Sequence, residues 1–306
     1  MKNRVASHSK VARNKRSSAL FLTALWSAMG TFCVASCAFS SPILGADLAT
    51  FAVLGASGVT NVPTSIIGGH VGSAPNASIG GGYIFTSGSL QANTATAQQA
   101  QRDLDAAILT LSAFGVGTTI SDGNLDAWQS ANGGKVAPGT YTVSAANANL
   151  TGNLILDGGA SNSAVWVFQF PSTLSTSTSS NVVVQNVGDG AKVGVYWNVH
   201  SAATLNGSSF AGNVLAHELI SSNGGLAIAC GRLLSATSQV TLNQDSISIT
   251  GCNGSSGGYD QGAAIGTGGT TVPEPDALAL LACGFAALAL ARRQQSMSAS
   301  SASQRS

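Results

Sequence analysis

The fold is decided by three short stretches, Val193-Gly194-Val195-Tyr196-Trp197, Gly212-Asn213-Val214-Leu215-Ala216 and Gly231-Arg232-Leu233-Leu234-Ser235. The second and third begin 19 residues apart. Three more apolar stretches occupy comparable points of successive repeats: Ala203-Thr204-Leu205, Ile220-Ser221-Ser222 and Val240-Thr241-Leu242. A repeat of about twenty residues with β-branched side chains and no helical pattern is typical of a β-solenoid. The sequence therefore predicts stacked coils with long, flat outer faces.

One segment departs from this strand pattern. Between Gln91 and Phe114, apolar residues recur at steps of three and four, at Ala97, Ala100, Leu104, Ile108 and Leu111. This spacing predicts a single amphipathic helix over about residues 91–114, packed closely against a sheet because its stripe is rich in alanine. The following stretch, 117–149, is rich in Gly, Asn and Ser and holds one strand candidate, Tyr141-Thr142-Val143.

The charge of the chain excludes several functions. Only 8% of residues are charged, against about 25% in ordinary globular domains. Between Asp47 and Thr270 there are four basic and ten acidic residues, a net charge of −6. This region has no basic patch, so nucleic acid is not an expected partner.

No catalytic motif stands out either. The sequence has no nucleophile elbow, no phosphate-binding glycine motif and no cluster of carboxylates with a nearby base, as a solenoid lyase would need. His200, His217 and Glu218 lack a recognised metal-ligand spacing, so they are interpreted as polar surface residues. We expect no enzyme activity, no cofactor and no metal.

The N-terminus has the layout of a secretory signal peptide. Basic residues in 1–18 precede an apolar stretch from Ala19 to Phe39, and small residues follow up to Ala46. Residues 1–46 are therefore predicted to be removed by signal peptidase. An alternative is a lipobox at Val34-Ala35-Ser36-Cys37, which would make Cys37 a lipidated first residue.

The C-terminus resembles the PEP-CTERM sorting signal of Gram-negative bacteria. After a Gly/Ser-rich linker, 251–271, the chain reads Val272-Pro273-Glu274-Pro275, then an apolar run, then Arg292-Arg293. The resemblance covers 272–293 and implies transient membrane insertion and cutting by an exosortase-type enzyme. A polar tail, 294–306, follows. The protein would then be secreted or retained at the surface of a Gram-negative cell. An ordinary C-terminal membrane tail is the alternative.

Two cysteines remain once the segments at the ends are set aside. They are Cys230 and Cys252, and in an exported domain they suggest one disulfide. A disulfide closing a loop of this length would contribute about 3 kcal/mol and would pin the last coil, where fraying is expected. Two free buried thiols are the alternative.

The segments, taken in order, resemble the ice-binding-protein-like family of microbial secreted proteins. The resemblance spans residues 47–250 and is carried by these motifs: Phe51-Ala52-Val53-Leu54, Ser57-Gly58-Val59-Thr60-Asn61, Ala97-Gln98-Gln99-Ala100, Pro138-Gly139-Thr140-Tyr141, Leu150-Thr151-Gly152-Asn153-Leu154, Ala164-Val165-Trp166-Val167-Phe168-Gln169 and Gly212-Asn213-Val214-Leu215-Ala216. It implies a mainly β fold, a right-handed, triangular, parallel β-solenoid with one long helix along a face. It also implies a discontinuous strand order, in which the N-terminal strands join the later ones.

The resemblance implies an exported, non-catalytic protein that binds ice crystals and inhibits their recrystallisation. Adjacent parallel strands lie about 4.8 Å apart, close to a repeat of the ice lattice, and outward Thr and Ser each offer a hydroxyl. The residues expected on the ice-binding face are Thr60, Ser65, Thr204, Ser208, Ser221, Ser222, Thr237 and Thr241. The family's T-A/G-x-T/N pattern occurs only approximately, as in Ser201-Ala202-Ala203-Thr204.

An alternative function uses the same flat surface. A cell-surface or matrix adhesin could bind polysaccharide or another solid. In that interpretation, outward aromatic side chains such as Tyr196 would stack on sugars.

Overall fold

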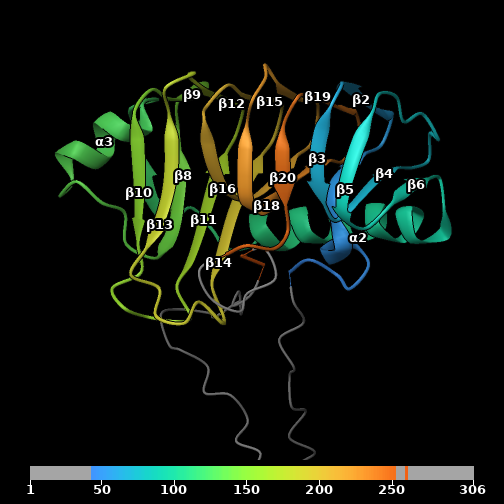
Figure 1. Ribbon diagram of the computed structural model, residues 1–306. Coiled ribbons are helices and arrows are strands. Elements are labelled where there is room, and N and C mark those ends of the chain that lie inside the picture. Colours follow the sequence, from blue (N-terminus) through green and yellow to red (C-terminus); the bar gives the residue numbers. More distant parts are fainter. Residues whose placement is uncertain (1–42, 253–258, 261–306) are drawn as a thin grey trace, which may run out of the picture. The chain divides into compact units, whose positions relative to one another are not determined.

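Short parallel strands joined by turns form a stack of three-sided coils, as drawn in Figure 1. The computed structural model describes residues 43–252 and 259–260, all of which belong to the compact unit 40–272. Each coil passes in turn over a helix face, a hydroxyl face and a third face. The mainly β, parallel solenoid predicted from the sequence is therefore confirmed. Among the described residues, neither α-helix combines the length and the apolar composition needed to cross a membrane.

The helix face is the stack of strands covered by the long helix. In spatial order it contains β7 (Thr118–Ile120), β8 (Gly139–Val143), β11 (Val165–Phe170), β14 (Gly194–Val199), the second halves of β16 (Ser209–Ala216) and β18 (Ala227–Ser235), β1 (Phe51–Gly55), β4 (His70–Ser73) and β6 (Leu90–Ala92).

The hydroxyl face is a separate six-stranded parallel sheet. Its order is β9 (Asn147–Leu150), β12 (Thr173–Thr176), β15 (Ala203–Leu205), β17 (Ile220–Ser222), β19 (Gln239–Asn243) and β2 (Gly58–Val62). The labelled strands of this face follow one another along the top of Figure 1.

The third face completes each coil. It contains β10 (Asn153–Asp157), β13 (Asn181–Gln185), the first halves of β16 and β18, β20 (Ser246–Ser248), β3 (Ser65–Gly68) and β5 (Tyr83–Ser87). Strands β16 and β18 turn the corner from this face to the helix face at Gly212 and Gly231. A Cβ on Gly231 would come within 1.9 Å of the Gly212 carbonyl oxygen, so only glycine permits these two corners to stack.

The order of coils differs from the order of the chain, as predicted. Strand β1 pairs with β18 through Val53 and Leu233, β2 pairs with β19, and β3 pairs with β20. The N-terminal coils therefore extend the stack beyond the last strand of the chain. The disulfide at Cys230 consequently pins an interior coil, and the expectation that it pins a fraying end of the solenoid was wrong.

The long helix was predicted over residues 91–114 and runs from Ala95 to Ser112 as α2. Thr94 caps its N-terminus, since the Thr94 hydroxyl accepts a hydrogen bond from the Ala97 amide at 3.2 Å. Its apolar stripe packs on Phe51, Leu54 and other helix-face side chains, forming a second core beside the one inside the coils.

Two short helical elements were not predicted. A 3-10 turn, η1 (Leu48–Thr50), leads into β1. A seven-residue helix, α3 (Leu125–Ala131), begins at the capping side chain of Asn124. Two turns are too short to give a clear apolar period, which is why sequence analysis identified only the strand at 141–143 in this stretch.

Candidate functional site

A single row of small polar side chains runs along the hydroxyl face. The strand register aligns one outward residue from each strand, in the order Asn149, Ser175, Thr204, Ser221, Thr241 and Thr60. Four of the predicted ice-face residues, Thr60, Thr204, Ser221 and Thr241, are thus placed in one continuous line. All six side chains are exposed or partly exposed.

Hydroxyl groups in this row contact one another directly. The Thr60 hydroxyl donates to the Thr241 hydroxyl at 3.2 Å, and the Ser221 hydroxyl donates to the Thr204 hydroxyl at 3.4 Å. These bonds run along the direction in which the coils stack, so neighbouring side chains hold each other in fixed positions. Such a surface has little side-chain entropy left to lose when it binds.

The hydroxyl face is more regular than the other two faces. Its described strand pairs run without a register shift, whereas shifts at Phe51/Val53, Phe210/Gly212 and Ile67/Gly68 interrupt the other faces. None of its six strands contains an acidic or basic residue. The result is an uncharged sheet with strands about 4.8 Å apart.

A second line of polar side chains lies beside the row. It consists of the amides of Asn206, Asn223 and Asn243, at the turns that follow β15 and β17 and at the end of β19. The Asn223 side chain donates to the Asn206 side chain at 2.5 Å, and the Asn243 side chain donates to the Asn223 carbonyl at 3.3 Å. This amide ladder fixes the border of the hydroxyl face.

Two predicted ice-face residues point inward and cannot touch an external surface. Ser222 and Ser65 are 4% and 0% exposed. The Ser222 hydroxyl donates to a carboxylate oxygen of Asp245 at 2.7 Å, and the Ser65 hydroxyl donates to Asn61 at 2.7 Å and accepts from the Asp245 amide. Both were wrong predictions, because successive strand residues point to opposite sides of the sheet and each falls on the inward side.

These inward hydroxyls help to build a corner around Asp245. Besides Ser222, the carboxylate accepts hydrogen bonds from the backbone amides of Leu226 and Asn243, each at 3.0 Å. Burial raises the pKa of Asp245, and these hydrogen bonds oppose the rise. The corner joins the hydroxyl face to the third face.

The two remaining predicted residues lie at corners of the coils. Ser208 is exposed in the turn before β16, and its hydroxyl donates to the Thr178 carbonyl at 3.1 Å. Thr237 is exposed between β18 and β19, and its hydroxyl donates to the His217 carbonyl. Both are at the borders of the hydroxyl face and outside its row.

Sequence reasoning missed Asn149 and Ser175. Both extend the row across β9 and β12. The coils that contain them are longer than the later ones, so the period of 19 residues does not reach them. The stretch Ser172-Thr173-Leu174-Ser175, which resembles Ser201-Ala202-Ala203-Thr204, was the available signal.

The third face is less suited to the same role. Its corresponding outward row reads Asn153, Asn181, Ser209, Ala227, Ser246, Ile66 and Ile84. Ile66 and Ile84 are 44% and 55% exposed. Amide side chains thus occupy one end of this row and bulky apolar side chains the other, with small residues only between them.

Two other groups of residues were weighed from the sequence as possible sites. The His200 and His217 rings stack with centroids 6.1 Å apart, and Glu218 accepts a hydrogen bond from Ser201. Within residues 43–252 and 259–260, no group of three or more His, Cys, Asp or Glu side chains could hold a metal ion. Tyr196 is fully buried beneath α2, so it offers no aromatic platform for a sugar.

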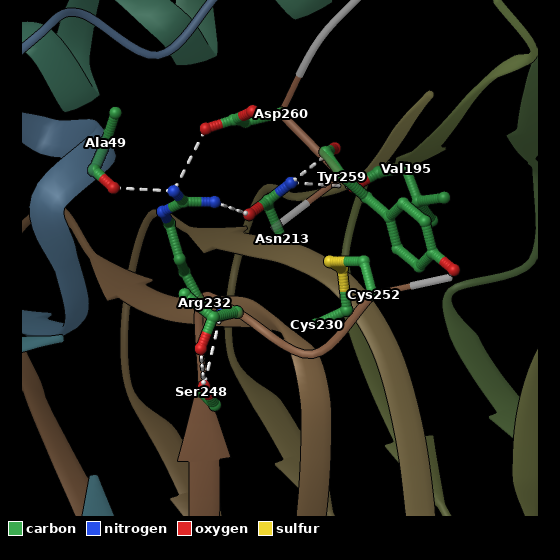
Figure 2. The surroundings of a disulfide bond; sticks show 10 residues. Ala49, Val195, Asn213, Cys230, Arg232, Ser248, Cys252, Tyr259 and Asp260 are labelled. Carbon is green, nitrogen blue, oxygen red and sulfur yellow. Dashed lines mark hydrogen bonds and ion pairs between the residues drawn. A yellow bond between two sulfur atoms is a disulfide. The ribbon is translucent and has the colours of Figure 1, made fainter. Parts of the chain in front are cut away.

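The C-terminal end of the described chain is fastened by a buried cluster, shown in Figure 2. The Arg232 guanidinium contacts the Asp260 carboxylate at 3.0 Å, the Asn213 side chain at 2.8 Å and the Ala49 carbonyl. Burial lowers the pKa of Arg232, and the Asp260 charge opposes that change. The predicted disulfide between Cys230 and Cys252 lies beside this cluster.

Buried residues near both ends of the domain bear on two predicted boundaries, which stay predictions. Tyr259 and Asp260 fall within the predicted linker, 251–271, yet both are buried and belong to the folded domain. Ile43 and Leu44 fall within the predicted signal peptide, 1–46, yet their side chains are buried in the core beneath α2. Residues 1–42 of the predicted signal peptide and the whole sorting segment, 272–293, lie outside the described residues.

Comparison with known proteins agrees with this geometry. A family model of ice-binding-like proteins matches residues 53–248. The chain is 33% identical over 277 residues to an ice-binding protein of Nostoc sp. (strain HG1), covering 88% of this chain and 93% of that one.

Solved structures show the same fold. One is an ice-binding protein of the Antarctic ascomycete Antarctomyces psychrotrophicus, with a TM-score of 0.58, 32% identity, and 66% of this chain and 96% of that one covered. Another is an ice-binding protein from an Antarctic biological consortium, with a TM-score of 0.59, 29% identity, and 68% and 90% covered. The chain therefore belongs to the ice-binding-like family.

Proposed function

We propose that this protein is an exported, non-catalytic ice-binding protein that adsorbs to ice crystals through its hydroxyl face and inhibits their recrystallisation. The observation that carries the proposal is the uncharged row from Asn149 to Thr60, one small polar group from each of six parallel strands. Its regular spacing can order water into an ice-like layer.

No single contact in the row is strong. A net hydrogen bond contributes only about 1 kcal/mol. Affinity comes from several weak contacts made at once by a rigid surface. The hydrogen bonds between Thr60 and Thr241 and between Ser221 and Thr204 supply part of that rigidity.

Export rests on the two ends of the sequence. The proposal includes removal of a signal peptide by signal peptidase and recognition of Val272-Pro273-Glu274-Pro275 and Arg292-Arg293 by an exosortase-type enzyme after transient membrane insertion. The protein would then act outside a Gram-negative cell, either released or at its surface.

The direct test is partition of the purified chain into a slowly growing ice hemisphere. We expect enrichment in the ice, while a mutant with Thr204→Tyr and Thr241→Tyr stays in the liquid. Exclusion of the wild-type chain from ice, together with retention on a column of exopolysaccharide, would contradict the proposal and favour a polysaccharide adhesin.

A further inference from the structure

Both ends of the folded domain leave the stack along one edge. Each coil runs from the helix face to the hydroxyl face to the third face, so the edge between the third face and the helix face lies opposite the hydroxyl face. Ala49 precedes Phe51, which begins helix-face strand β1, and Asp260 forms an antiparallel bridge with Gly194, which begins β14. Both residues are therefore at that edge.

The C-terminal exit is also near the middle of the stack. Strand β14 is fourth in the order of nine strands on the helix face. The coil that begins at Gly194 carries Thr204, the third of the six positions in the hydroxyl row. Asp260 thus lies across the coil from the centre of the proposed ice-binding surface.

Hydrogen bonds and an ion pair hold the chain at Tyr259 and Asp260, in addition to the pairing of the strands. In the described part of the chain the last strand, β20, ends at Ser248, and Tyr259 and Asp260 belong to none of the named strands. Even so, the Tyr259 carbonyl accepts hydrogen bonds from the Val195 amide at 3.0 Å and the Asn213 side chain at 2.9 Å. Asp260 adds its buried ion pair with Arg232 at 3.0 Å.

The Cys230–Cys252 disulfide strengthens this attachment of the C-terminal end. Arg232 binds the Ala49 carbonyl as well as Asp260, so one guanidinium holds both ends of the domain. If the ion pair opens under tension, the Cys230–Cys252 disulfide still joins the chain to β18, which is paired with β16 on one side and with β1 and β20 on the other. Tension on the C-terminal side therefore enters an interior strand.

We propose that the domain works as a tethered ice adhesin, with the edge at Asp260 as its load-bearing attachment point. This rests on the proposed function, because it takes the hydroxyl face as the ice-binding surface. A pull at mid-length, directed away from that face, loads all contacts of the row together. A pull at one end of the stack breaks the contacts one after another, beginning with the nearest.

The test compares two attachment points on beads pressed against ice and exposed to rising flow. One full-length chain carries a biotin-acceptor handle after Ser306, so the load enters through Asp260. The other carries the same handle inserted after Gly115, which lies before β7 at one end of the stack and has open space around it. An insertion after the exposed Ser89, just before β6 at the other end, provides a second end-loaded variant.

Each chain is first assayed free in solution for ice partition and thermal melting, and only folded chains with equal partition are compared on beads. We expect end-loaded beads to be lost at a flow that beads loaded through the C-terminus survive. Equal retention would overturn the tethering proposal and leave the ice-binding proposal intact. Failure of the free wild-type chain to enter ice would overturn both.

Discussion

Thr60 and Thr241 are 181 positions apart in the sequence, and their hydroxyl groups are joined by a 3.2 Å hydrogen bond. The bond links the first hydroxyl-face strand of the chain, β2, to the last, β19. The two ends of the domain thus contribute neighbouring positions to one surface, and neither end alone forms the row.

The role of this surface can be tested with bulky substitutions. Thr241→Tyr places a ring in the row between Ser221 and Thr60, and we expect loss of ice partition because the ring holds the crystal away from neighbouring hydroxyls. Tyr is favoured in strands, so thermal melting should change little. The matched control is Ser246→Tyr, at an exposed outward position of β20 on the third face. Ice binding that survives Thr241→Tyr and disappears with Ser246→Tyr would move the ice-binding surface to the third face.

The helix core offers a stability test with an internal control. Leu104 is fully buried on α2, and Leu104→Ala should lower the free energy of unfolding by about 2–5 kcal/mol. Leu109, on the same helix, is 73% exposed, so Leu109→Ala should change it by less than about 0.5 kcal/mol. Urea unfolding of both variants measures the difference, and similar losses would mean that α2 is not packed as described.

The disulfide makes a separate contribution. Replacing both Cys230 and Cys252 by Ser should destabilise the domain by about 3 kcal/mol, as expected for a loop of this length. Urea unfolding with and without a reductant measures this value. The reductant should shift the wild-type midpoint and leave that of the double variant in place. A wild-type midpoint indifferent to reductant would show that the thiols are free in solution.

The lowered pKa of Asp157 predicts how the stability of the domain changes in acid. The backbone amide of Gly159, followed by Lys135 and Gln185, lowers the pKa of Asp157 below its usual value. Because the folded-state pKa is depressed, the stabilisation is complete above the unfolded value of about 4 and is lost as the pH falls below it. Asp157→Asn should therefore reduce stability at pH 7, and the gap to the wild type should close under acid conditions. A gap of constant size across that range would contradict this account.

The buried side chains before residue 46 predict where the mature protein starts. Cleavage after Ala46 would remove Ile43 and Leu44, which pack in the core beneath α2. We expect N-terminal sequencing of the exported chain to give a start before Ile43. A start at Asp47, in a protein with unchanged melting temperature, would show that these two side chains contribute little.

The solenoid and its long helix could be predicted because their signals are local and repeated. The stretches beginning at Gly212 and Gly231 do lie side by side in register, and the apolar positions from Ala97 to Leu111 do face the sheet. The discontinuous order was predicted by family resemblance alone. No local pattern near Val53 indicates that its partner is Leu233.

The candidate site was predicted less completely because it depends on the side to which each strand residue points. In Ile220-Ser221-Ser222, Ser221 faces outward and Ser222 faces Asp245, although both are serines in one short strand. A register error of one residue exchanges the two sides. No local feature of the sequence fixes that register. The predicted ice-binding face therefore included Ser65 and Ser222 and missed Ser175.

The pairing of β1 with β18 has a consequence for how the molecule comes into being. In a polypeptide that emerges with its N-terminus first, Val53 can pair early with Val71 on β4, but its partner on the other side, Leu233, follows only much later. Contacts so distant along the chain form slowly. The pairing of β1 with β18 can form only after most of the domain has been synthesised. Such delayed closure would suit the proposed export, in which the precursor passes unfolded through a translocation pore and folds on the far side.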